Sequence, residues 1–122
     1  MDALGMADVP VGIGSAGGVS DDTTFECYDA GYSVPRQDIY QSGLDLVCRG
    51  LESVPDKSVQ LLCLASLTDV AVLIKEHHDL FSSKVQEVVL MGGVMPLQEN
   101  EMLIPDTAYN NNCDMASARA KI

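Results

Sequence analysis

A short apolar run that ends at two glycines constrains the fold of this chain more than any other feature. Val88–Met91 begins with β-branched residues, contains no polar residue and stops at Gly92 and Gly93. An uninterrupted apolar run is typical of a strand in a parallel sheet, because helices cover both faces of such a sheet. Ligands of open α/β sheets bind beside the carboxyl ends of the strands. We therefore expect a ligand site in residues 94–114, a polar loop that follows the run.

Alternating strand and helix patterns surround this run. Apolar residues recur at helical spacing after Arg36, Pro55 ends that helix, and Thr68 is a good N-cap for the next one. Asp114 is the expected N-cap of a last helix. The order predicts an α/β fold with a partial, open, Rossmann-like parallel sheet and flanking helices. The expected elements are strands at 9–14, 59–64 and 88–91, and helices at 36–53, at 68–80 and from 115 onward.

Composition and charge exclude several classes of protein. The chain has 122 residues, 47% of them hydrophobic, so it is long and apolar enough to bury a core. Its formal net charge of -11 argues against nucleic acid as a partner, because binding phosphates needs a basic surface. No apolar run approaches the roughly 20 residues of a membrane span, and Met1–Gly5 lacks the features of a signal peptide. We therefore predict a cytoplasmic protein without a membrane partner, its 4 cysteines reduced.

Two short motifs near the start of the chain have more than one interpretation. Residues 12–17 form the pattern G-x-G-x-x-G, which binds dinucleotides only where a helix opens on the last glycine. The continuation Val19–Thr24 is acidic and poor in helix formers, so a dinucleotide-binding domain that uses Gly12–Gly17 is the least favoured functional alternative. Asp21 and Asp22 could bind a divalent cation or be simply solvated.

Four segments, spread over most of the chain, match the order of segments in one known family. Asp8–Val11 is similar to its D-V-P-V segment, and Ala65–Ala71 to its G-P-L-T-N-x-A turn. Val88–Gly93 is similar to its V-V-x-M-G-G strand end, and Thr107–Asp114 to its A-E-F-N-x-x-x-D segment. Together they resemble the nucleoside hydrolases, the inosine- and uridine-preferring N-ribohydrolases. The resemblance implies hydrolysis of the N-glycosidic bond of ribonucleosides to base and ribose, with a calcium ion that binds the ribose and the attacking water.

The resemblance also implies roles for particular residues. Leu64 stands where the family uses a backbone carbonyl to ligate calcium, and Met91 matches a methionine beside the ribose. Asn110 matches the asparagine that hydrogen-bonds the sugar hydroxyls, and Asn100 is a candidate for a second one. From the residues alone, Met91 is also a plausible core residue and the asparagines are plausible turn formers. The expected ligand is a ribonucleoside or ribose, and no residue is assigned a catalytic role.

The chain departs from that family in ways that bear on activity. Ala108 replaces a ribose-binding glutamate, and the D-x-D-x-x-x-D-D motif that holds most of the calcium is absent. We therefore expect residues 1–122 to be a single truncated nucleoside hydrolase-like domain that binds calcium weakly and is itself inactive. The alternative is a non-catalytic nucleoside-binding, ribose-binding or regulatory relative. A truncated sheet exposes strand edges, which predicts self-association.

Overall fold

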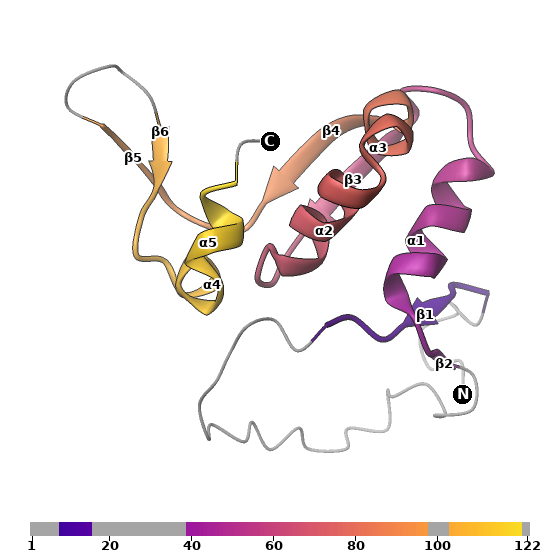
Figure 1. Cartoon of the computed structure of the whole chain (residues 1–122), viewed down its shortest axis with the longest axis horizontal. Helices are drawn as coiled ribbons and strands as arrows, with labels where there is room; N and C mark the ends of the chain where they lie inside the picture. Colours follow the sequence, from indigo (N-terminus) through magenta and orange to yellow (C-terminus); the bar gives the residue numbers. More distant parts are fainter. Residues whose placement is uncertain (1–7, 16–38, 98–102, 121–122) are drawn as a thin grey trace.

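The structure is a computed structural model that describes residues 8–15, 39–97 and 103–120. Helices and strands are mixed along these residues, which confirms the predicted α/β class with parallel strands and flanking helices (Figure 1). The elements are β1 (Val11–Gly12), β2 (Ile39–Tyr40), α1 (Gly43–Glu52), β3 (Val59–Cys63), α2 (Thr68–Glu76), α3 (His78–Lys84), β4 (Val85–Leu90), β5 (Val94–Pro96), β6 (Leu103–Pro105), α4 (Tyr109–Cys113) and α5 (Met115–Ala118).

The strands of the described residues form three separate pairs. β3 and β4 are parallel and pair Leu61 with Val88 and Leu62 with Val89, while β1 and β2 form a short parallel pair. β5 and β6 form an antiparallel pair. The parallel β3–β4 pair places the carboxyl ends of both strands at one edge, and the chain leaves that edge toward α2 and toward Gly92. This edge is where the sequence predicts a ligand site.

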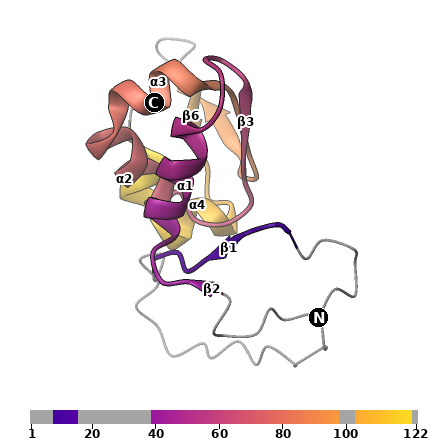
Figure 2. The same ribbon diagram turned by 90° about the vertical axis from the view of Figure 1, so that its right-hand side faces the viewer.

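The hydrophobic core lies on one face of the β3–β4 pair. Leu51 of α1, Leu73 of α2 and Val85 form its buried centre, and half-buried Leu61 and Val88 pack against them. Figure 2 shows α1, α2 and α3 on one side of β3. Side chains alternate across a strand, so the neighbouring residues face the opposite side, where Leu62 is 59% and Val89 45% exposed.

The expectation that helices cover both faces of the Val88–Met91 strand is therefore wrong for the described residues. Helices α1, α2 and α3 all lie on one side of β3, and the strand itself begins earlier, at Val85. An apolar run indicates that both faces of a strand are suited to burial. It does not indicate whether a second layer of helices covers the other face. The self-association predicted from unpaired strand edges stays a prediction.

The first helix is shorter than its periodicity predicts. Ile39 pairs with Val11 as part of a strand, so its position in the apolar repeat does not belong to α1. The helix begins at Gly43, because the Ser42 hydroxyl accepts a hydrogen bond from the Asp45 amide at 3.1 Å and caps the first turn. The same apolar residue types occur in short strands and in helices. The apolar pattern alone therefore extends the predicted helix into β2.

The helix predicted at 68–80 is divided into α2 and α3. His77, with φ of -129° and ψ of 40°, lies between them and interrupts the helical backbone. Thr68 is not the N-cap but the first helical residue, and its hydroxyl bonds to Asp114 rather than to its own helix. A long-range partner has replaced the local capping bond that the sequence predicts.

The polar segment 94–114 contains regular structure and is not a loop throughout. β5 and β6 form a hairpin, and the Asp106 amide donates to the Gly93 carbonyl at 3.0 Å. The prediction that Asp114 caps the last helix is confirmed, since its carboxylate accepts from the Ser117 amide at 3.0 Å.

Some residues considered from the sequence lie outside the described residues, namely Gly17, Asp21, Asp22, Cys27 and Asn100. Among the helices that the structure does describe, none has the length and apolar character needed to cross a membrane.

Candidate functional site

The side chain of Asn110 lies at the carboxyl edge of the β3–β4 pair. Its Nδ2 donates to the Leu64 carbonyl at 3.2 Å and to the Met91 carbonyl at 2.7 Å. Leu64 directly follows β3 and Met91 directly follows β4, so one amide joins the ends of both strands. Both neighbours are carbonyls that can only accept, so the NH₂ group must face them. We call Leu64, Met91 and Asn110 the carboxyl-edge site.

A second asparagine holds the glycine turn after β4. Asn111 is 5% exposed, and its Nδ2 donates to the Gly93 carbonyl at 2.8 Å and to two oxygens of Asp106 at 3.3 Å. Gly92 and Gly93 leave the space that this arrangement needs. A Cβ at Gly92 would lie 2.7 Å from the Asn111 Oδ1, and one at Gly93 would overlap the Asp106 carboxylate. The two glycines are thus required by close packing against α4 and the hairpin.

A network of hydroxyl groups and one carboxylate links α2 to the α4–α5 junction. The Thr68 hydroxyl donates to Asp114 Oδ2 at 2.7 Å, and the Ser117 hydroxyl donates to the same oxygen at 2.7 Å. The hydroxyls of Ser66 and Thr68 lie 3.1 Å apart. The Ser117 amide, the Thr68 hydroxyl and the Ser117 hydroxyl hold the pKa of Asp114 below its usual range, because all of them stabilise the ionised form.

The structure brings together three of the residues predicted from the sequence. Leu64, Met91 and Asn110 meet in the hydrogen bonds described above, and Met91 is 57% exposed. Their roles toward a substrate stay predictions. The sequence places Asp106 and Asn111 in the expected polar segment without assigning either a role. No pattern in N-N-N separates the asparagine that is buried from its neighbours.

The described residues do not make up a calcium site. Calcium takes six to eight oxygen ligands in proteins. The Leu64 carbonyl offers one such oxygen, and it already accepts a hydrogen bond from Asn110. No cluster of three or more histidine, cysteine, aspartate or glutamate side chains suited to a metal ion occurs in 8–15, 39–97 or 103–120. No chemical step through calcium follows from these residues.

The structure describes two glycines of the G-x-G-x-x-G pattern: Gly12 packs against α1, and Gly14 lies against Asp69 of α2. A Cβ at Gly12 would lie 2.8 Å from the Gly43 Cα. The Ser15 amide donates to both oxygens of the Asp69 carboxylate, at 3.0 and 3.2 Å. A carboxylate at this place repels the pyrophosphate of a dinucleotide, so the arrangement argues against the dinucleotide-binding alternative.

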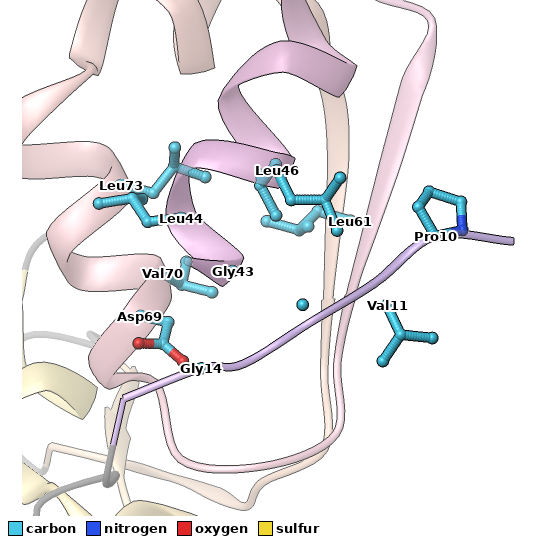
Figure 3. Close-up of a pocket in the computed structure, with 12 residues that line it drawn as sticks. Pro10, Val11, Gly14, Gly43, Leu44, Leu46, Leu61, Asp69, Val70 and Leu73 are labelled. Carbon is cyan, nitrogen blue, oxygen red and sulfur yellow. The ribbon is translucent and has the colours of Figure 1, made fainter. Parts of the chain in front are cut away.

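A cavity of about 430 Å³ lies between β1, α1, α2 and β3 (Figure 3). Apolar side chains such as Leu46, Leu61 and Val70 form most of its wall, and among the described residues Asp69 is the one charged residue that lines it. Its polar groups are few, in contrast to the carboxyl edge, where side-chain hydrogen bonds join distant segments.

Comparison with known proteins overturns the family assignment made from sequence motifs. No family model matches the chain, and no curated protein matches it. The assignment to the inosine- and uridine-preferring N-ribohydrolases is wrong, because the solved structures to which the chain is similar are effector proteins with a nucleoside hydrolase-like fold. Short motifs at strand ends and turns follow from the geometry of a fold, and one fold serves proteins of different function.

Two solved structures of effector proteins are similar to this chain. One is the type III effector protein XopQ complexed with adenosine diphosphate ribose, with 32% identity and a TM-score of 0.65, covering 74% of this chain and 26% of that one. The other is the effector protein XOO4466, with 31% identity and a TM-score of 0.63, covering 74% of this chain and 25% of that one. The chain thus spans about a quarter of the length of either effector. Over the part that it matches, it has the nucleoside hydrolase-like fold of these proteins.

Proposed function

We propose that the carboxyl-edge site binds the ribose of a ribonucleoside or of a ribose-bearing nucleotide such as ADP-ribose. The observation that carries the proposal is the Asn110 amide, held by the Leu64 and Met91 carbonyls at the ends of two parallel strands. This is the place in an α/β fold where ligands bind. The complex of XopQ with ADP-ribose supports the choice of a ribose-bearing ligand.

The chemistry of the amide fits a sugar hydroxyl. Both strand-end carbonyls take hydrogen bonds from Nδ2, so the Oδ1 of Asn110 is left as an acceptor, and among the described residues no donor reaches it. A ribose hydroxyl can donate a hydrogen bond to such an oxygen. Because both carbonyls hold the amide, its oxygen is oriented before the ligand arrives, which lowers the entropic cost of binding.

The proposal is tested by titrating the chain with ADP-ribose and with inosine in a calorimeter. We expect saturable binding of at least one ligand, and about five-fold weaker binding by Asn110→Ala, since one hydrogen bond contributes about 1 kcal/mol. The matched control is Asn112→Ala, which removes an exposed asparagine of the same helix that donates only to the Thr107 carbonyl. Melting temperatures of both variants show whether they remain folded.

Two results would contradict the proposal: no saturable binding of either ligand, or equal affinity in Asn110→Ala and the unsubstituted chain. The same samples provide a check on chemistry. The sequence lacks the D-x-D-x-x-x-D-D motif, so we expect no ribose release from inosine or uridine with calcium present. Release of ribose above a protein-free control would show that the chain is catalytic and not only a binding protein.

A further inference from the structure

Two side-chain hydrogen bonds join the same pair of segments at the same spacing. Asn110 donates to the Leu64 carbonyl, and Thr68 donates to Asp114, and in both pairs the residues are 46 positions apart. Segments 64–68 and 110–114 therefore meet at both of their ends, Leu64 with Asn110 and Thr68 with Asp114. One bond belongs to the proposed ribose site, and the other lies four residues further along each segment.

The Asp114 carboxylate uses its two oxygens in different ways. Oδ1 accepts from the Ser117 amide and caps α5, a local bond that the sequence alone predicts. Oδ2 accepts from the hydroxyls of Thr68 and Ser117. Thr68 thus ties the α4–α5 junction to the first turn of α2, close to the turn that carries Leu64.

α4 depends on such bonds more than a longer helix would. It has five residues, and its N-cap, Ala108, makes no side-chain capping bond. A helix of this length gains little stability from its own backbone. Its placement rests on the bonds of Asn110 and Asn111 at the strand ends and on Asp114 at its end.

We propose that Thr68 and Asp114 are positioning residues, which hold α4 in the register that places the Asn110 amide between the Leu64 and Met91 carbonyls. Neither residue needs to touch the ligand. The effect on affinity rests on the proposed ribose-binding function, whereas the effect on the Asn110 amide does not.

Thr68→Val is the most specific substitution for a test. Valine has the shape of threonine without the hydroxyl, so the bonds of that hydroxyl to Asp114 and to Ser66 are lost while the Oδ1 cap of α5 remains. The matched control is Ser117→Ala, which removes the other hydroxyl bond to Oδ2 but leaves the link between the two segments. Melting temperatures of both variants separate folding from positioning.

The first readout is the affinity for ADP-ribose in a double-mutant cycle. We expect Thr68→Val to weaken binding by up to about five-fold, the loss expected for Asn110→Ala, and Ser117→Ala to weaken it less than about two-fold. In the Asn110→Ala background, Thr68→Val should cause no further loss, because its effect passes through Asn110. An equal loss in both backgrounds would overturn the proposal.

The second readout is the side-chain amide signal of Asn110 in an NMR spectrum, assigned by its disappearance in Asn110→Ala. Thr68→Val should shift this signal and speed the exchange of its protons with water, and Ser117→Ala should leave it in place. An unchanged signal in folded Thr68→Val would overturn the positioning role. If the chain binds no ribose ligand, the proposed function fails, and this signal alone decides the inference.

Discussion

The carboxyl edge of β3 and β4 and the region around β1 differ in the contacts that hold them together. At the carboxyl edge, side chains of Asn110, Asn111 and Thr68 reach partners that are distant in the sequence. Around β1, backbone bonds such as Gly43 N to Ile13 O at 2.7 Å and a close glycine contact define the packing, next to a largely apolar cavity. Side-chain hydrogen bonds fix the orientation of the polar groups that form them, whereas the apolar side chains of the cavity wall do not orient a ligand. This difference is our reason for proposing the binding site at the carboxyl edge.

The largest effect is expected where the polar network is buried. Asn111→Ala removes the donor to the Gly93 carbonyl and to Asp106, and leaves these oxygens without that partner. We expect a loss of about 2–3 kcal/mol in the free energy of unfolding, measured by denaturant titration. The control Asn112→Ala, at an exposed position of the same helix, should cost less than about 0.5 kcal/mol. An equal loss of unfolding free energy in both variants would show that burial of Asn111 does not set it apart from the exposed Asn112.

A smaller effect of opposite sign is expected around β1. Val70 lines the cavity of about 430 Å³, so Val70→Leu places an added methylene in empty space. We expect a gain of roughly 0.5–1 kcal/mol in the free energy of unfolding, as is typical of cavity filling. Val89→Leu, on the exposed face of β4, is the control and should change stability little. A loss in Val70→Leu would mean that this region is as tightly packed as the carboxyl edge.

The smallest effect concerns the pH dependence of the Asp114 link. Hydrogen bonds from Ser117 and Thr68 lower the folded-state pKa of Asp114, so its contribution to stability is present above the ordinary aspartate pKa and is lost as pH falls through the lowered value. Thr68→Val removes one of these bonds. Its melting temperature should therefore fall less steeply than that of the unsubstituted chain below about pH 4.

Asp56 serves as an internal reference in that experiment. Its bond to Lys84 also lowers its pKa, and Thr68→Val does not touch this pair. Any acid dependence that Asp56 causes is therefore common to both proteins and cancels in the comparison. If the melting temperatures of the two proteins fall equally steeply with pH across the acid range, the Thr68 bond does not stabilise the ionised form of Asp114.

Local patterns in the sequence were sufficient to predict much of the framework. The apolar runs predicted β3 and the carboxyl end of β4, and Asp114 was recognised as the cap of α5. The motifs also selected Leu64, Met91 and Asn110, which the structure brings together. These features depend on residues within a few positions of each other, or on the rule that parallel strands end at one edge.

Tertiary structure alone decided which partner each polar group takes. The sequence predicts that Thr68 is an N-cap, yet its hydroxyl donates to the Asp114 carboxylate, 46 positions away. Asn110 and Asn111 are adjacent and chemically identical, and only the register of α4 against the strand ends assigns one to the site and the other to the buried turn. Local propensity is determined by backbone sterics within a few residues, whereas these bonds depend on how distant segments pack.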